Sequence, residues 1–302
     1  MEHQALTGLT AGQLGMLILL VRQDIGDVVR PGGRPAAIGL ADSVKMVVAL
    51  MRRNLVQQLA GETFGCSQPT VSRRWDLLRP AIGIVLARYV PDPVQVLGRD
   101  GTALVDGTIC PVWDWSAIPD LYSGKAGYCG MNVQVAASLN GDIAAIGPHA
   151  LHGARNDAIA FGKSGLKDLL EKARGDGNNG ADLGYRGVDG ITIVPFRKPR
   201  GGGLLDWQKQ FNAVFSKIRA AVEHANATLK CWRMLSEEGG RYRCPIGKYD
   251  SMLAAVTGLL FFSQYYEALL NNPQGPAIAD PQGGDMFDTW TDYWPWLILP
   301  PK

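Results

Sequence analysis

The chain has 302 residues, of which 46% are hydrophobic and 19% are charged. This length and composition favour a large globular domain with a smaller companion, or two domains, and exclude a disordered chain. The uncharged stretch from Ala5 to Val21 contains three glycines and has no basic leading segment, which argues against a signal peptide or a membrane span. We therefore expect a cytoplasmic protein.

The cysteine count and the net charge bear on which classes of protein and of partner are possible. Five cysteines, an odd number without a C-x-x-C pair, support neither a disulfide framework nor a structural zinc site. The net charge of +2 divides into +6 for residues 1–235 and −4 for residues 236–302. The larger part of the chain thus carries a weak electrostatic preference for a polyanion.

The first 98 residues are predicted to be helical. Apolar residues follow helical spacing over Leu14–Val21 and Val44–Leu59, and the breaker cluster Arg30–Pro35 lies between them. A first short helix is expected from Val56 to Gly65 and a second from Gln68 to Ile82, with Ser67 as its cap.

These two short helices have the form of a helix-turn-helix. Ala60, Phe64 and Val71 are expected to face inward, and Gly65 allows the tight turn. Five polar residues of the second helix are expected to face outward and to contact DNA: Gln68, Thr70, Ser72, Arg73 and Arg74. Residues 1–98 are accordingly predicted to form a DNA-binding domain; the alternative is an ordinary helical hairpin.

From Ala103 onward the pattern changes to short strands. Strands are predicted over Ala103–Val105, ending at Asp106, over Met131–Ser138, over Ile143–Gly147 and over Ile191–Pro195, with a hairpin turn at Asn140-Gly141. A helix is expected over Asn156–Ala173. The fold class predicted for this part is α/β, with a mixed sheet flanked by helices.

The predicted helix from Asp206 to Leu235 carries two parallel stripes. Apolar residues at alternating spacings of four and three predict the face turned to the core: Phe211, Phe215, Ile218, Val222, Ala225, Leu229 and Trp232. One position along lies a polar stripe of Asn212, Ser216, Arg219, Glu223, Asn226 and Lys230. Glu223 is therefore expected at the rim of the core, beside cations on the same face.

Two further acidic residues lie near predicted strand ends. Asp106 precedes Gly107, and Asp182 lies in a glycine-flanked stretch, so either could be an ordinary turn aspartate. Together with Glu223, however, they provide the oxygen ligands that a magnesium-dependent phosphoryl-transfer site requires.

Six motifs in chain order carry a resemblance to a known family. They are Asp106-Gly107-Thr108, Ser123-Gly124-Lys125, the stretch Gly130–Val135, the stretch Gly153–Asp157, the stretch Asp182–Gly187, and Arg219-x3-Glu223-x6-Lys230 followed by Trp232-Arg233. In this combination the chain resembles the DDE transposases of the bacterial insertion-sequence-five (IS-five) group and their PIF/Harbinger relatives. The resemblance extends from about Arg30 to Phe262.

The resemblance implies an RNase H-like catalytic domain over residues 99–270, with Asp106, Asp182 and Glu223 as catalytic and metal-binding residues. It implies two Mg²⁺ ions per site, with Mn²⁺ as a substitute. Asp157 competes for the second acidic position; Asp182 is preferred because the second carboxylate of this fold follows the fourth strand, and Asp157 remains as a supporting acid. Ser216 replaces the tyrosine usual in the IS-five group, and the segment before Asp182 predicts a short fourth strand.

The same resemblance implies double-stranded DNA as the partner, in the form of element ends and target. Five cations are then expected to contact phosphates: Lys125, Arg155, Arg186, Arg219 and Lys230. Cleavage and joining of two ends imply a homodimer or larger assembly on DNA, and an association with the nucleoid. The alternatives are a transposase-derived sequence-specific DNA-binding protein without catalysis, and a nuclease without strand transfer.

A few residues are left with open interpretations. His149 and His152 are expected in loops; the alternative for His152, which lies near the predicted site, is a contact with DNA. Trp113 and Trp115 either stack on an unpaired base or pack in the core. The acidic, tryptophan-bearing tail 271–302 is predicted to be a docking or self-association segment, or else a disordered tail.

Overall fold

The computed structural model describes residues 3–27, 36–98, 101–115, 117–174 and 177–271. The chain divides into two compact units, one formed by residues 1–90 and 231–302 and the other by residues 91–230. The predicted domain boundaries at residues 98 and 270 differ from this division, because the segment after residue 230 groups with the N-terminal helices. The breaker cluster Arg30–Pro35 and the tail beyond Asn271 lie outside the described residues.

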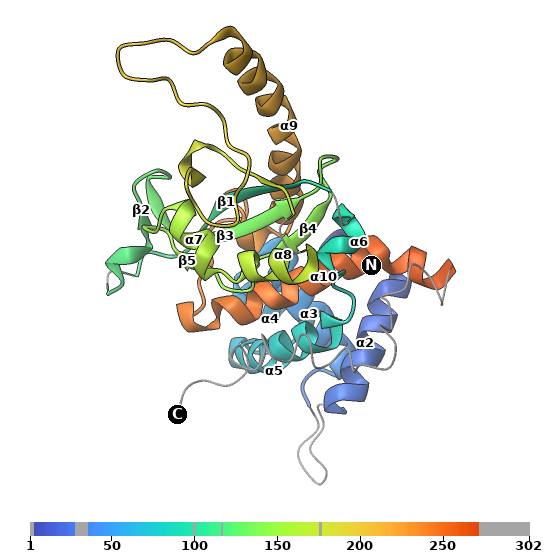
Figure 1. Ribbon diagram of the computed structural model, residues 1–302. Coiled ribbons are helices and arrows are strands. Elements are labelled where there is room, and N and C mark those ends of the chain that lie inside the picture. Colours follow the sequence, from blue (N-terminus) through green and yellow to red (C-terminus); the bar gives the residue numbers. More distant parts are fainter. Residues whose placement is uncertain (1–2, 28–35, 99–100, 116, 175–176, 272–302) are drawn as a thin grey trace. The chain divides into compact units, whose positions relative to one another are not determined.

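The unit that contains the N-terminus is helical (Figure 1). Its α-helices are α1 (His3–Thr7), α2 (Ala11–Ile25), α3 (Leu40–Arg53), α4 (Gln57–Phe64), α5 (Gln68–Ala87) and α10 (Tyr249–Asn271), with 3-10 turns at Arg233–Leu235 and Ile246–Lys248. Helix α2 begins at a capping box, in which the Thr10 hydroxyl and the Gln13 side chain each accept a hydrogen bond from the other residue's backbone N–H.

Helices α5 and α10 pack closely against each other. A Cβ on Gly83 of α5 would touch Ala254 and Ala255 of α10, and one on Gly258 of α10 would collide with Leu86. The two glycines thus allow the helix backbones to approach. In the described part of the chain, no helix is long and apolar enough to cross a membrane.

The helices of this unit differ in extent from the prediction. The residues Val44–Leu59, whose apolar spacing predicted one helix, do not form one, because Asn54 adopts a left-handed conformation (φ 51°) that ends α3. Helix α5 continues past Ile82 to Ala87, since its later residues are buried against α10. Ser67 takes the cap position, but its hydroxyl lies 3.1 Å from that of Thr70 and caps no backbone N–H.

The second unit is built around a mixed sheet. Its strands are β1 (Ala103–Pro111), β2 (Tyr122–Ser123), β3 (Tyr128–Ala137), β4 (Ile143–Ile146), β5 (Leu151–His152) and β6 (Asn179–Gly180). Strand β3 runs antiparallel to β1, β2, β4 and β5, whereas β6 runs parallel to β1. The helices are α6 (Pro93–Leu97), α7 (Asp157–Lys163), α8 (Leu166–Arg174) and α9 (Asp206–Lys230), with 3-10 turns at Pro119–Leu121 and Leu183–Tyr185.

The predicted hairpin is confirmed, with Gly141 at φ 90° in its turn, and the expected mixed α/β architecture is confirmed with it. Four predicted spans were wrong. Strand β1 continues through Asp106 to Pro111, because it pairs with β3 along its whole length. The predicted helix over Asn156–Ala173 breaks at Gly165 (φ 77°) into α7 and α8.

The other two corrections concern the C-terminal half of this unit. Around Ile191–Pro195 the described residues form only an isolated parallel bridge, between Gly180 and Ile193. Helix α9 ends at Lys230 rather than Leu235, so Trp232 does not extend its apolar stripe; Phe211, at the other end, is exposed. Strand β6 has two residues, in agreement with the predicted short fourth strand.

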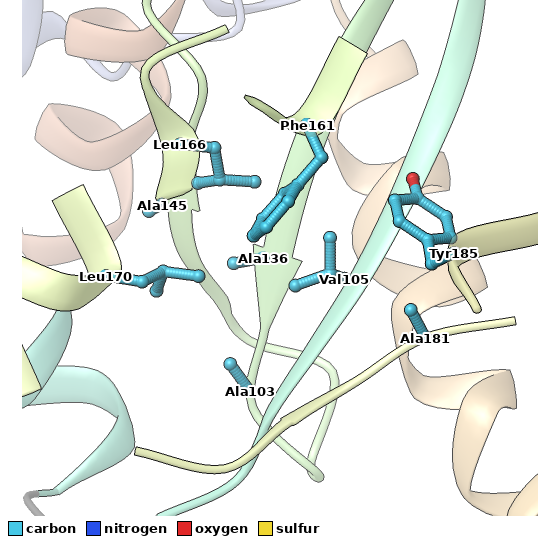
Figure 2. Packing of buried hydrophobic residues seen from close by; sticks show 9 residues of the cluster. All are labelled: Ala103, Val105, Ala136, Ala145, Phe161, Leu166, Leu170, Ala181 and Tyr185. Atoms are coloured by element: carbon cyan, nitrogen blue, oxygen red, sulfur yellow. The ribbon is translucent and has the colours of Figure 1, made fainter. Parts of the chain in front are cut away.

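The core of this unit lies on one face of the sheet, under α7 and α8 (Figure 2). Ala103 and Val105 of β1 pack on Phe161, Leu166 and Leu170, and they alternate with Leu104 and Asp106, which face the other side of the sheet. Val222, Ala225 and Leu229 of α9 are buried, and α9 contacts β1 and β3. Each face of β1 therefore has its own helical cover.

Candidate active site

Strand register places Asp106 and Asp182 side by side. Leu104 of β1 pairs with Gly180 of the parallel strand β6, and the two aspartates each lie two residues further along. Because side chains alternate with a period of two, both aspartates extend from the sheet at the same level and on the face shared by Leu104 and Gly180. The ring of Phe215, on α9, lies over Gly180, so this is the face that α9 covers.

Helix α9 supplies two direct contacts to Asp106. The Arg219 guanidinium lies 3.6 Å from one carboxylate oxygen, and the Asn226 side-chain amide donates a hydrogen bond of 3.1 Å to the other. Glu223 lies four residues after Arg219 and three before Asn226, so it belongs to the same helix face. This agrees with the polar stripe predicted from the sequence. Glu223 itself is exposed rather than at the rim of the core, as was expected, and among the described residues its side chain forms no hydrogen bond or ion pair.

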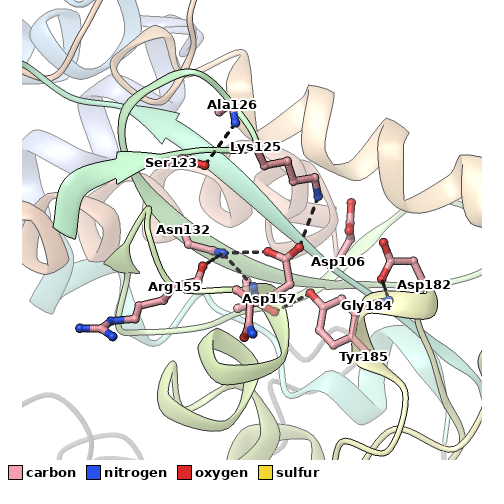
Figure 3. A network of polar contacts seen from close by, with 12 residues as sticks. Asp106, Ser123, Lys125, Ala126, Asn132, Arg155, Asp157, Asp182, Gly184 and Tyr185 are labelled. Atoms are coloured by element: carbon pink, nitrogen blue, oxygen red, sulfur yellow. Dashed lines mark hydrogen bonds and ion pairs between the residues drawn. The ribbon is translucent and has the colours of Figure 1, made fainter. Parts of the chain in front are cut away.

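Asp157, the first residue of α7, approaches β1 from the opposite face. Its carboxylate accepts a hydrogen bond of 2.8 Å from Asn132 and lies 3.4 Å from the Lys125 ammonium (Figure 3). Asn132 of β3 is paired with Ile109 of β1, and Ile109 lies on the sheet face opposite to Asp106. The register thus places Asp157 and Asp106 on opposite faces of the sheet, although the charge of Asp157 acts on the Asp106 carboxyl group more strongly than that of Asp182. The choice between Asp182 and Asp157 as the second carboxylate stays a prediction.

A chain of buried polar side chains holds Asp157 in place. The Tyr185 hydroxyl donates to Gln134 (2.9 Å), Gln134 donates to Asn132 (2.8 Å), and Asn132 donates to Asp157 (Figure 3). Burial, reinforced by the charge of Asp157, raises the pKa of Tyr185, so its phenol remains a donor. The sequence analysis assigned no role to this chain, although Asn132 and Gln134 alternate with apolar residues in a buried strand, which is the signal that marks them.

The chain of polar groups explains why glycine follows Asp106. A Cβ on Gly107 would collide with the side chains of Asp157, Gln134 and Asn132. We expect Gly107→Ala to displace this chain and to lower the free energy of unfolding by about 1–3 kcal/mol, the cost of leaving buried polar groups unpaired. Urea unfolding measures the effect.

Gly124→Ala is the matched control for that substitution, because a Cβ there meets no atom within 4 Å. Equal stability of the Gly107→Ala variant and the wild type would contradict the steric role of Gly107.

The surroundings of Asp106 raise the pKa of its carboxyl group. Its side chain is 17% exposed, and burial raises the pKa of its carboxyl group to about 6, with Arg219 opposing the shift and Asp157 and Asp182 adding to it. Figure 3 draws the three aspartates together with the polar side chains that contact Asp157. Asp106 therefore carries negative charge that the surrounding cations do not fully balance.

The side chains that would hold a metal ion are oxygen donors, which suits a hard divalent cation. Among the described residues, no three acidic, histidine or cysteine side chains are already close enough together to hold one. Asp182 instead accepts a hydrogen bond of 2.8 Å from the backbone N–H of Gly184. The oxygen donors of these side chains and the unbalanced negative charge of Asp106 suit a divalent cation. To bind it together, the carboxylates would have to move closer to one another.

The cations expected to contact phosphate have different surroundings. Lys125 is exposed above its ion pair with Asp157, Arg155 pairs with Asp120 at 2.6 Å, and Arg186 is exposed with no ion pair among the described residues. Arg219 pairs with Asp106 at 3.6 Å, and its expected contact with phosphate stays a prediction. Lys230 is the half-buried last residue of α9.

The outward face predicted for α5 is only partly exposed. Gln68 and Arg73 are exposed, whereas Thr70, Ser72 and Arg74 are half-buried, and so is Phe64, which was expected inside. Gln68 donates to Gln57 of α4 (2.6 Å), and Arg73 donates to Thr70 (3.3 Å). Burial, followed by the charge of Arg73, lowers the pKa of Arg74, whose Nε has no hydrogen-bond partner.

The aromatic residues after β1 and the two histidines lie as follows. Trp113 is exposed and Trp115 is half-buried, with an indole N–H that has no hydrogen-bond partner. His152 lies in β5 rather than in a loop, and His149 precedes that strand.

Comparison with known proteins defines the class. A family model described as DDE superfamily endonuclease matches residues 105–260, which include Asp106, Asp182 and Glu223. The chain belongs to the DDE superfamily of endonucleases.

Two relatives carry more particular names. One, "Putative transposase for insertion sequence element IS112" of Streptomyces albus G, is 31% identical over 232 residues, which cover 76% of this chain and 84% of the relative. The other, "Probable transposase for insertion sequence element IS702" of Microchaete diplosiphon, is 25% identical over 265 residues, which cover 84% and 92%. No solved structure matches the chain.

Proposed function

We propose that this protein is a DNA transposase that binds the ends of its element, cleaves them by metal-dependent hydrolysis and joins the 3′-hydroxyl ends to target DNA. The observation that carries the proposal is the shared face of Asp106, Asp182 and α9, the helix that bears Glu223. The names of the two relatives support it.

The proposed catalytic residues are Asp106, Asp182 and Glu223, with Asp157 as a supporting acid. The three proposed ligands would hold two Mg²⁺ ions, for which Mn²⁺ is a substitute. Bound there, the ions would stabilise charge on the attacking and leaving oxygens of an in-line displacement. Arg219 and Asn226 orient the Asp106 carboxylate, and the Tyr185–Gln134–Asn132 chain orients Asp157.

Two successive displacements at phosphorus account for the reaction. In the first, the oxygen of water bonds to phosphorus at the element end and the 3′ oxygen leaves with a proton, which gives a 3′-hydroxyl and a 5′-phosphate. In the second, that 3′-hydroxyl loses its proton, bonds to a target phosphorus and displaces the target's own 3′ oxygen. Lys125 and Arg186, both exposed, are proposed to position the phosphates, together with Arg155 and Lys230.

We also propose that the sheet is RNase H-like and that the protein is affiliated with the IS-five group and the PIF/Harbinger transposases. The parallel strand β6 beside β1, followed by Asp182, supports the fold assignment. Assembly as a homodimer or larger complex on DNA, and an association with the nucleoid, are parts of the same proposal.

A mapping experiment tests the proposal. The full-length protein is incubated with labelled element-flanking DNA, a supercoiled target and Mg²⁺, and the products are sequenced. Cuts at the element ends together with joined products support a transposase. Cuts without joined products would indicate a nuclease, and end binding without cuts would indicate a DNA-binding protein that has lost catalysis.

The proposed reader of the element ends is the α4–α5 helix-turn-helix. The double substitution Arg73→Ala/Arg74→Ala is expected to weaken end binding and to flatten its salt dependence by up to about two counterions, because each Arg–phosphate contact releases close to one ion. Fluorescence anisotropy over a salt series measures the slope.

Arg22→Ala/Arg241→Ala is the matched control for this test, since it removes two exposed cations from other positions of the same compact unit. A salt slope that Arg73→Ala/Arg74→Ala leaves unchanged would place DNA recognition elsewhere in the chain.

A further inference from the structure

A strongly basic segment precedes and opens α9. Between Phe196 and Lys217 the chain has five basic residues, Arg197, Lys198, Arg200, Lys209 and Lys217, and a single acidic one, Asp206. This segment, named here the basic arm, thus carries +4, although the whole chain carries only +2. Figure 1 shows its loop and the first turns of α9 extending beyond the sheet of their own unit.

The charges of the basic arm are largely available to a partner. Arg197, Lys198 and Arg200 are exposed, and within the described residues they form no ion pair. Lys209 pairs with Asp206 at 2.9 Å, but both side chains are solvent-exposed, and such a pair is weak. Three exposed cations thus lie within four consecutive positions of the chain.

An ordered row of aromatic rings lies beside these cations. Phe196 meets Trp207 edge-on at 4.9 Å between ring centroids and Phe211 at 5.3 Å, and Phe211 stacks on Phe215 at 5.8 Å. Phe215 is buried and anchors the row, whereas Trp207 at its outer end is 56% exposed.

The base of the loop is fixed to the helix. The Asn212 side chain accepts a hydrogen bond from the backbone N–H of Phe196 (2.8 Å) and donates one to its carbonyl oxygen (2.9 Å). The indole of Trp207 is therefore presented on a supported scaffold rather than on a free loop. An exposed aromatic ring next to cations is the combination that binds single-stranded nucleic acid, by stacking and by phosphate contact.

We propose that the basic arm is a second DNA-contact surface, in which Arg197, Lys198 and Arg200 bind backbone phosphates and Trp207 stacks on an unpaired base. This inference rests on the proposed function, which makes DNA the partner. The charge favours DNA over a second copy of the chain, because a symmetric contact would bring two arms of +4 together. Neither the helix-turn-helix nor the carboxylate site includes these residues.

The test compares two labelled DNAs, a blunt duplex and the same duplex with an unpaired overhang, using full-length protein and anisotropy over a salt series. The triple variant Arg197→Ala/Lys198→Ala/Arg200→Ala is expected to flatten the salt slope by about two to three. Trp207→Leu is expected to weaken binding of the overhang DNA roughly 5- to 150-fold relative to the blunt duplex. Trp207→Phe should retain most of that preference, because it keeps a stacking ring.

A single Lys198→Ala change is expected to flatten the salt slope by about one, and Lys163→Ala, which removes an exposed cation of α7, is its matched control. An unchanged salt slope in the triple variant, or equal losses on both DNAs for Trp207→Leu, would overturn the proposal. A Trp207→Leu change that alters only the sedimenting mass would identify a contact between copies instead and would also overturn it.

These binding measurements, combined with the cleavage mapping described above, separate this inference from the proposed transposase activity. Wild-type protein that cleaves element ends while the arm variants bind normally would refute the arm alone. Wild-type protein that binds overhang DNA through the arm but never cuts would refute the catalytic proposal alone.

Discussion

Asp106→Asn, Asp182→Asn and Glu223→Gln are each expected to lower cleavage at element ends by roughly a thousandfold or more, with end binding largely retained. Each change removes one ligand charge and almost no volume, and a loss of about 4 kcal/mol in transition-state stabilisation corresponds to that factor. Cleavage of end-labelled DNA in Mg²⁺, with binding measured in parallel, gives both quantities.

Asp168→Asn on α8 is the matched control, because Asp168 is an exposed acid away from the site and its loss should leave cleavage intact. The Asp157→Asn variant tests which aspartate is the second catalytic carboxylate. Full cleavage by Asp182→Asn, together with loss of cleavage in Asp157→Asn, would reverse the assignment of the second carboxylate.

Asp106→Asn is also expected to stabilise the fold at neutral pH. The pKa of Asp106 is raised in the folded protein from 3.8 to about 6, so the folded state holds this proton more tightly than the unfolded state does. The stability that the protonated carboxyl contributes is present below pH 4 and is lost as pH rises through about 6.

A neutral asparagine escapes this loss, so the variant should gain up to about 3 kcal/mol at pH 8 and nothing comparable at pH 4. The loss of the ion pair between Arg219 and Asp106 reduces this gain in stability. Urea unfolding at the two pH values measures the difference. Adding Mg²⁺ should stabilise the wild type more than the variant, and an equal effect of the substitution at pH 4 and pH 8 would contradict the electrostatic account.

The sequence predicted the local patterns that depend on spacing. The polar stripe of α9, the Asn140-Gly141 hairpin, the short strand before Asp182 and the start of α7 at Asp157 all follow from the period of apolar residues and from turn chemistry. Arg219 and Asn226 reach Asp106 because the stripe repeats with the helical period.

Features that depend on tertiary pairing could not be predicted in this way. The extension of β1 beyond Asp106 requires the partner strand β3, and the course of the Tyr185–Gln134–Asn132–Asp157 chain requires three segments to meet across the sheet. The return of residues 231–271 to the N-terminal helices required the contact between α10 and α5, which no local pattern indicates.

The packing of α10 on α5 has a consequence for biosynthesis. Residues 91–230 form a continuous unit, whereas the helices before residue 91 share their unit with α10, which is made last of the described helices. Domains generally fold as units during synthesis, and contacts between such distant segments carry a high entropic cost. We therefore expect the sheet unit to fold first, although it is encoded second, and a fragment that stops at residue 98 lacks the helix that packs on α5.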